Sequence, residues 1–223
     1  MKILSKRKTI ARWVSAVLAI GSFFSAVQAD VGTPETKGTG IYGEFDLSQA
    51  PTDGGSRHAM LKEMFEAGET HTYSDRHPDN KLWVFRPEGL KEGEQRPCVF
   101  LIHGGSWSGH PMDYGAYAVH LAGQGYVAVV IEWRRYDVEQ GFSPKDCLAD
   151  CLTAYRWVKQ RAKRLNIAPD EMFIGGHSAG GHLALSMLTM KGYSDPQDDQ
   201  TITIDPKGLI LVNPAIDLVD GWH

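Results

Sequence analysis

Four short, uninterrupted apolar runs limit the folds open to this chain of 223 residues. Runs of this length are typical of strands buried on both faces of a parallel sheet. Segments with helical spacing of apolar residues separate them. This alternation predicts right-handed βαβ units and an α/β fold, with a mostly parallel central sheet flanked by helices. The runs are CVFLI (98–102), YVAVVI (126–131), MFIGG (172–176) and GLILVN (208–213).

The clearest helical segment covers residues 144–165. Ser143 is a suitable N-cap, Pro144 suits the first turn, and Asp146 lies at the positive end of the helix dipole. Basic residues gather at the far end, where the dipole is negative. One apolar stripe follows the 3.6-residue period; it consists of Leu148, Cys151, Leu152, Tyr155, Val158, Ala162 and Leu165.

The segment before the first apolar run is more polar. Residues 58–67 have short helical spacing and end at Gly68. THTYSD (70–75) and KLWVFRP (81–87) alternate well enough to form two strands of a hairpin. We expect residues 30–68 to form a leader with a short helix, followed by one domain over 69–223.

The first 29 residues have the order of a secretory signal peptide. The apolar stretch from Trp13 to Val27 has 15 residues, short of the roughly 20 that a membrane-spanning helix needs. We therefore favour an exported protein over a membrane-anchored one, with Ala29 before the cut and Asp30 after it. The basic start consists of Lys2, Lys6, Arg7, Lys8 and Arg12.

The net charge limits the kinds of partner that this chain is expected to bind. Removing residues 1–29 removes five positive charges and no negative ones, so the net charge changes from −4 to −9. An acidic chain without basic clusters argues against nucleic acid or an anionic membrane as partner.

We interpret Cys98, Cys147 and Cys151 as buried packing residues, because a four-residue helical spacing, as between Cys147 and Cys151, suits a disulfide poorly. No motif indicates a metal, and no cofactor is implied.

The third apolar run leads into Gly176-His177-Ser178-Ala179-Gly180, which matches G-x-S-x-G. On its own the match is weak, but here it follows a buried strand and precedes a helix. A turn that tight forces the serine into strained backbone geometry, and only glycine tolerates the crowding on each side. The alternative is a serine that merely caps a helix. We predict that Ser178 is an exposed nucleophile at the carboxyl edge of the sheet.

HGGSW (103–107) follows the first apolar run. Consecutive glycines let backbone N–H groups turn toward one point. With the N–H of Ala179, those of Gly104, Gly105 and Ser106 are expected to bind the oxyanion that forms when a serine attacks a carbonyl. The alternative is a loop without a role in catalysis, which is less favoured because a nucleophile motif is also present.

These motifs resemble the α/β-hydrolase superfamily, in particular the hormone-sensitive-lipase-like and related bacterial carboxylesterases. The resemblance extends from about residue 70 to 223 and also includes Trp133-Arg134 and GLILVNPAIDL (208–218). Many relatives have a third glycine where this chain has Ser106, whose backbone N–H remains. The resemblance implies an acyl hydrolase that uses a serine, a histidine and an acid.

The acid and the base are harder to assign. The chain order in this fold is Ser, then Asp or Glu, then His, and only 45 residues follow Ser178. Asp217 is the candidate acid, and His223 and His182 are poor candidates for the base. His182 is expected to pack beneath the nucleophile turn, while His103 and His177 orient loops. We therefore expect a hydrolase fold that lacks its last strands.

The sequence thus predicts an exported esterase or lipase that cleaves small ester substrates through an acyl-enzyme on Ser178. An amidohydrolase of formamidase type, which shares an HGG-x-W element, and a serine peptidase are alternatives within the fold. A non-catalytic, hydrolase-like binding protein is the alternative from another class.

Overall fold

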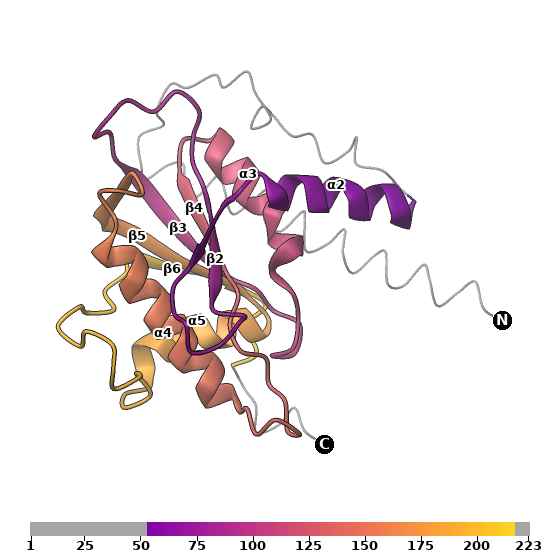
Figure 1. Cartoon of the computed structure of the whole chain (residues 1–223), viewed down its shortest axis with the longest axis vertical. Coiled ribbons are helices and arrows are strands. Elements are labelled where there is room, and N and C mark those ends of the chain that lie inside the picture. The colour runs from indigo at the N-terminus through magenta and orange to yellow at the C-terminus, as the bar shows by residue number, and fades with distance from the viewer. Residues whose placement is uncertain (1–52, 217–223) are drawn as a thin grey trace. The chain divides into compact units, whose positions relative to one another are not determined.

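The computed structural model describes residues 53–216, and within them a six-stranded mixed sheet forms the centre (Figure 1). The strand order is β1-β2-β4-β3-β5-β6. The strands are β1 (Glu69–Thr72), β2 (Lys81–Phe85), β3 (Arg96–Ile102), β4 (Val127–Ile131), β5 (Ile167–His177) and β6 (Gly208–Val212).

Pairing within the sheet follows the predicted division into a parallel centre and a hairpin. β4, β3, β5 and β6 pair in parallel, and each overlaps one of the four apolar runs. β1 pairs antiparallel with β2, and β2 pairs antiparallel with β4. The expected parallel sheet and the expected hairpin are therefore both confirmed. β5 begins earlier than its apolar run, because Ile167 pairs with Arg96 across an irregularity in the register.

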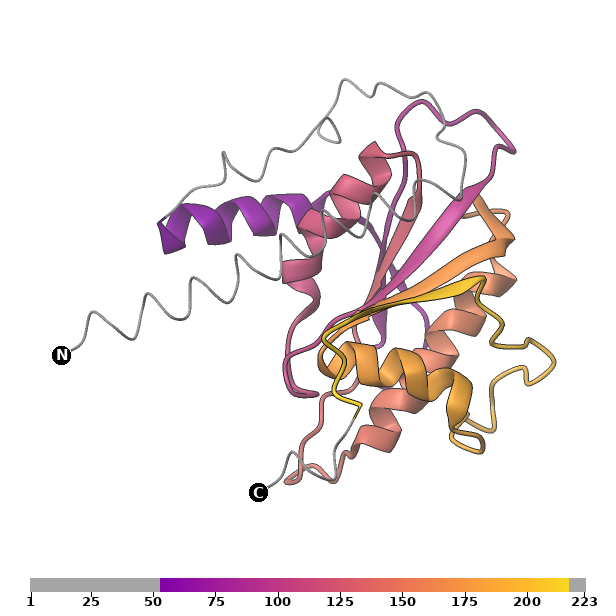
Figure 2. The same ribbon diagram turned by 180° about the vertical axis from the view of Figure 1, so that it is seen from behind.

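Helices cover both faces of the sheet. They are α2 (Gly54–Glu66), α3 (Gly115–Gly123), α4 (Pro144–Gln160) and α5 (Ala179–Thr189), with a 3-10 turn, η2 (Pro111–Tyr114), before α3. α4 packs against α5, whereas α2 and α3 lie together on the opposite face (Figures 1 and 2). Right-handed crossovers explain this arrangement, since the connection from β3 to β4 runs one way across the sheet and those to β5 and β6 run the other way.

α4 begins as predicted but ends earlier than expected. Ser143 and Asp146 form a capping box, and Pro144 lies in the first turn. The helix ends at Gln160 rather than at residue 165. The chain turns there because Asn166 adopts a positive φ of 60° and the N–H of Ile167 donates to the carbonyl of Ala162 at 2.8 Å.

α2 starts earlier than the segment 58–67 that the sequence predicts. The side chain of Asp53 caps it by accepting from the N–H of Ser56 at 2.8 Å. Its last turn packs on α3 through Phe65, whose ring also lies 4.4 Å from that of Trp83. A β-carbon on Gly115 would lie 2.9 Å from Phe65, so glycine permits the close packing.

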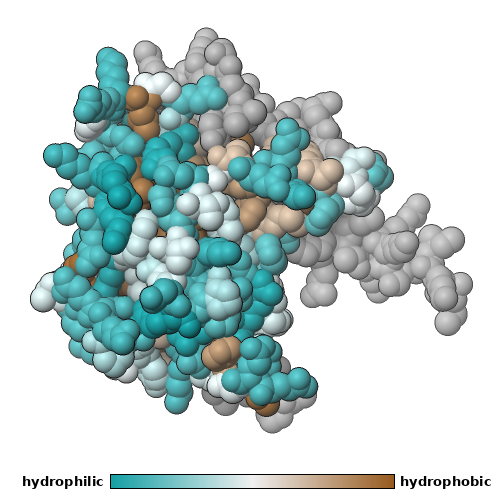
Figure 3. All heavy atoms as spheres, viewed as in Figure 1, coloured by the Kyte–Doolittle hydropathy of each residue, from teal (hydrophilic) through white to brown (hydrophobic). Residues whose placement is uncertain are grey.

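The core lies between the sheet and α4. Phe100, Trp133 and Tyr155 are fully buried there. Cys98, Cys147 and Cys151 are buried free thiols, as expected of packing residues. The outer surface over α4 and α5 is predominantly hydrophilic (Figure 3), as amphipathic helices require. Among the residues described, no helix is long and apolar enough to cross a membrane.

The topology fixes where a site can form. From β3 the chain moves to β4 on one side, and from β4 it crosses to β5 on the other side of β3. The loops that follow β3 and β5 therefore leave the sheet in opposite directions. In open α/β sheets, ligands bind at the carboxyl ends of strands at such a switch point.

Candidate active site

Ser178 occupies the turn between β5 and α5. Its backbone has φ 53° and ψ −119°, a sparsely populated region for a residue with a side chain. Three backbone hydrogen bonds hold it. Its N–H donates to the carbonyl of Val212 at 3.0 Å, and its carbonyl accepts from His182 at 3.0 Å and from Ala215 at 3.2 Å. A strained residue persists when its surroundings determine it in this way.

The glycines on either side of Ser178 are sterically required. A β-carbon on Gly176 would lie 2.3 Å from the carbonyl oxygen of Gly180. A β-carbon on Gly180 would lie 2.1 Å from the carbonyl oxygen of Ile102, at the end of β3. Both distances are far below van der Waals contact, so the turn excludes any larger residue. This is the strand-turn-helix context in which G-x-S-x-G presents a nucleophile.

The loop after β3 runs directly beside this turn. A β-carbon on Gly104 would lie 2.5 Å from the carbonyl oxygen of His177 and 3.3 Å from the Cβ of Ser178. Three successive residues then have positive φ, at 93° for Gly105, 53° for Ser106 and 60° for Trp107. Successive backbone N–H groups in turns of this kind form anion-binding concavities. The structure thus brings Gly104, one of the predicted oxyanion residues, next to Ser178.

His103 lies behind this loop. Its side chain is fully buried and stacks on Trp133, with ring centroids 4.5 Å apart and planes 8° apart. Burial lowers the pKa of His103 to about 4, so the ring is neutral at neutral pH. Its Nδ1 lies 3.0 Å from the carbonyl oxygen of Gly104. A carbonyl oxygen only accepts, so Nδ1 carries the proton and donates it.

This hydrogen bond fixes the direction of a neighbouring donor. In a trans peptide the C=O and the N–H point in opposite directions, and the bond from Gly104 to Gly105 is trans. The N–H of Gly105 therefore points away from His103. The geometry suits the loop-orienting role that the sequence predicts for His103.

The aromatic-arginine pair after β4 fastens the next loop to α4. The Nε and Nη2 of Arg134 donate to the two carboxylate oxygens of Asp150 at 2.9 and 2.8 Å. The backbone N–H of Arg134 also donates to Asp150 at 2.9 Å. Asp150 is 1% exposed. This two-pronged ion pair thus ties the chain after β4 to α4.

The remaining candidates are placed as follows. Ala179 is buried at the start of α5, directly after Ser178. The rings of His103 and His182 form their hydrogen bonds with groups other than the hydroxyl of Ser178. His182 is half-buried, lies one helical turn after Ser178 and is turned toward Trp107 of the loop after β3. Asp217 and His223 lie outside the described residues, as does the segment 1–29.

Sequence reasoning missed the contact between Trp107 and His182. The sequence indicates Trp107 only as part of the HGGSW motif and His182 only as a poor candidate for the base. One signal in the sequence could have found the contact: each residue is aromatic, carries a ring nitrogen, and follows a strand that ends at the carboxyl edge of the sheet.

Among the residues described, no group of three or more His, Cys, Asp or Glu side chains is arranged to hold a metal ion.

Comparison with known proteins agrees with this geometry. A relative in Schizosaccharomyces pombe, an AB hydrolase superfamily protein, is 29% identical over 60% of this chain and 38% of its own length. The probable carboxylic ester hydrolase LipM of Mycobacterium tuberculosis is 33% identical over 49% of this chain and 26% of its own. The chain thus spans well under half the length of both relatives.

Solved structures give the same fold. Native esterase 2 of Thermogutta terrifontis, described as a thermophilic esterase, has a TM-score of 0.61 and 31% identity, over 68% of this chain and 54% of that one. The form phosphorylated by paraoxon has a TM-score of 0.62 and 30% identity, over 67% and 58%. These similarities confirm the α/β-hydrolase fold.

A family model described as BD-FAE matches residues 84–217. The match covers more than half of the chain and contains both the loop after β3 and the nucleophile turn. The chain therefore belongs to the BD-FAE family of the α/β-hydrolase superfamily.

Proposed function

We propose that this protein is a serine carboxylesterase whose nucleophile is Ser178. The observation that carries the proposal is the approach of Gly104 to Ser178 at the switch point of the sheet. It places a glycine loop with a run of positive φ values beside a serine in a strained turn. Relatives described as carboxylic ester hydrolases and an esterase of known structure support the same reaction class.

The proposed reaction has two steps. The Oγ of Ser178 attacks the ester carbonyl while a general base takes its proton, and the carbonyl oxygen becomes an oxyanion. Backbone N–H groups of Gly104, Gly105, Ser106 and Ala179 stabilise that charge. The C–O bond to the alcohol then breaks, the alcohol leaves with a proton, and the acyl group stays on Ser178. Water repeats the sequence on the acyl-enzyme and releases the acid.

The base and the acid are proposed to come from outside residues 53–216. The order of catalytic groups in this fold puts both after the nucleophile, and Asp217 remains the candidate acid. We also propose that the protein is exported and begins at Asp30 after processing. N-terminal sequencing of protein secreted from its native cells tests this point. A mature chain that still begins at residue 1 contradicts it.

The experiment for the function compares Ser178→Ala with the parent, expressed from the complete reading frame, on short p-nitrophenyl esters. Loss of a nucleophile of this kind lowers kcat by about 10⁴-fold or more. Ser56→Ala is the matched control, because Ser56 lies on the exposed surface of α2. Activity of Ser178→Ala within tenfold of the parent would refute the assignment. Testing aryl formamides and peptides beside the esters separates an esterase from an amidohydrolase or a peptidase.

A further inference from the structure

Two residues that the reaction scheme does not use link the two halves of the site. We propose that Trp107 and His182 are positioning residues whose hydrogen bond sets the separation between the oxyanion N–H groups and the nucleophile helix. The inference rests on the proposed esterase function and deepens it.

The contact is a directional one. The indole Nε1–H of Trp107 donates to the Nδ1 of His182 at 3.3 Å. The rings meet edge to face, with centroids 5.5 Å apart and planes at 82°. A hydrogen bond weakens steeply when its donor and acceptor are misaligned, unlike a contact between two apolar surfaces. The bond therefore fixes one orientation of the two elements rather than merely filling space.

Each partner is rigidly tied to one half of the catalytic machinery. Trp107 ends the run of positive φ that starts at Gly105, and its carbonyl accepts from the N–H of Tyr136 at 2.7 Å. His182 lies one helical turn after Ser178, and its N–H donates to the carbonyl of Ser178 at 3.0 Å. A shift of either ring thus moves the donors relative to the nucleophile.

The proton arrangement on His182 is consistent with this role. An indole N–H only donates, so the Nδ1 of His182 must be unprotonated. Nε2 then carries the proton, and it faces the Oγ of Ser186 at 3.5 Å. Burial lowers the pKa of His182 and so favours the neutral ring that the contact needs.

A link of this kind affects rate more than it affects folding. Oxyanion donors act only when they lie within hydrogen-bond distance of the developing charge. A misplacement of about 1 Å can cost roughly 100-fold in rate. Substrate binding in the ground state depends far less on these donors. Loss of the link should therefore lower kcat while KM changes little.

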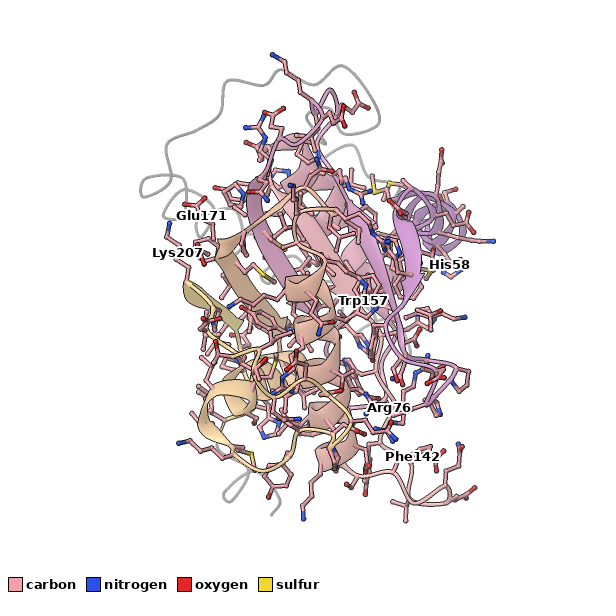
Figure 4. All side chains as sticks on the ribbon, turned by 60° about the vertical axis from the view of Figure 1, so that its left-hand side comes forward. His58, Arg76, Phe142, Trp157, Glu171 and Lys207 are labelled. Atoms are coloured by element: carbon pink, nitrogen blue, oxygen red, sulfur yellow. The ribbon has the colours of Figure 1, made fainter. Side chains whose placement is uncertain are left out.

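The variants separate the hydrogen bond from the ring. Trp107→Phe keeps an aromatic ring and removes the donor, and His182→Leu removes the acceptor. His182→Asn restores the acceptor, because the Oδ1 of asparagine and the Nδ1 of histidine are both bonded to Cγ. Trp157→Phe is the matched control. Trp157 lies on α4, where its ring packs against His71 at 5.3 Å (Figure 4).

The test measures kcat and KM on a short p-nitrophenyl ester, with protein expressed from the complete reading frame. Trp107→Phe and His182→Leu should each lower kcat by about 10- to 100-fold, with KM within about threefold of the parent. The double variant should be no worse than either single one, because both remove the same bond. His182→Asn and Trp157→Phe should keep kcat within about threefold. Parent-like kcat in both single variants, or a His182→Asn variant as slow as His182→Leu, would overturn the proposal.

A second readout does not depend on activity. The indole N–H resonance of Trp107, identified by its loss in Trp107→Phe, should move upfield in His182→Leu and stay near the parent position in His182→Asn. No movement in His182→Leu would overturn the link even if a variant were too unstable for kinetics. A parent protein without ester hydrolysis would refute the proposed function by itself, and the positioning role with it. The resonance would then report on the bond alone.

Discussion

Gly104 lies so close to Ser178 that a β-carbon added to the glycine would be 3.3 Å from the Cβ of the serine. The two residues are far apart in sequence and follow neighbouring parallel strands, β3 and β5. Their approach depends on glycine at 104, since the same β-carbon would be 2.5 Å from the carbonyl oxygen of His177. The candidate site is thus a contact between two loops that the sheet holds together.

Gly105→Ala tests the oxyanion loop. At φ 93° an alanine is strained, and its Cβ would lie 2.5 Å from the Cα of Gly109, so the loop must move. We expect kcat to fall by about 100-fold or more. Gly89→Ala is the control, because Gly89 also has positive φ, at 71°, but has nothing within 4 Å of an added β-carbon. A Gly105→Ala variant with parent-like kcat would show that this loop does not stabilise the transition state.

Asp150→Ala tests the support of the loop after β4. The change leaves the guanidinium of Arg134, whose side chain is 16% exposed, without the carboxylate that binds it at two points. Removing one partner of a buried pair costs about 3 kcal/mol or more of the unfolding free energy. Urea denaturation measures this loss. The control is Glu66→Ala, whose exposed ion pair with Lys62 is worth at most about 0.5 kcal/mol. Equal effects of the two variants would contradict the account.

His103 predicts a dependence of stability on pH. Burial lowers its pKa in the folded protein from the usual 6.5 to about 4. Between these values the unfolded chain binds the proton more strongly, so the unfolding free energy falls as the pH drops from about 6.5 to 4. At about 1.4 kcal/mol per pKa unit, the contribution of His103 is roughly 3 kcal/mol.

His103→Asn measures this contribution, because it keeps a donor on the atom bonded to Cγ but does not titrate. Denaturation at pH 7 and pH 4 should show a smaller loss of stability in the variant than in the parent. Other buried histidines titrate equally in both proteins, so the difference between them isolates His103. Identical pH dependence in parent and variant would mean that the ring is not held neutral.

The strands and the nucleophile turn were predictable because their signals are local. A short, uninterrupted apolar run rich in β-branched residues, such as VAVVI, is typical of a strand buried on both faces. The glycines around Ser178 are needed because any side chain there would clash with the backbone of the turn itself, so their positions can be read from the local sequence. The start of β5 was missed because Ile167 to Glu171 contains a proline and ends in two acidic residues. Its pairing with β3 comes from the tertiary structure.

The finer geometry of the site required the structure. Gly105 can adopt a positive φ without strain, but nothing in the identities of Ser106 and Trp107 predicts the same conformation for them. The helical period placed His182 one turn after Ser178, yet it did not say which loop would face that turn. Trp107 contacts His182 because β3 and β5, the strands that precede these two residues, are neighbours in the sheet. The acid and the base stay predictions, since Asp217 and His223 lie outside the described residues.

The central claim is that Ser178 is the nucleophile, and covalent labelling tests it most directly. A fluorophosphonate is added to the ester-hydrolysing protein, the serine oxygen bonds to phosphorus and fluoride leaves. Trypsin then releases residues 165–191, a peptide that contains both Ser178 and Ser186, and fragmentation in the mass spectrometer distinguishes the two serines. The account predicts one adduct per chain, on Ser178, with activity lost in proportion and no labelling of Ser178→Ala. An adduct on another serine, or equal labelling of the Ser178→Ala variant, would contradict it.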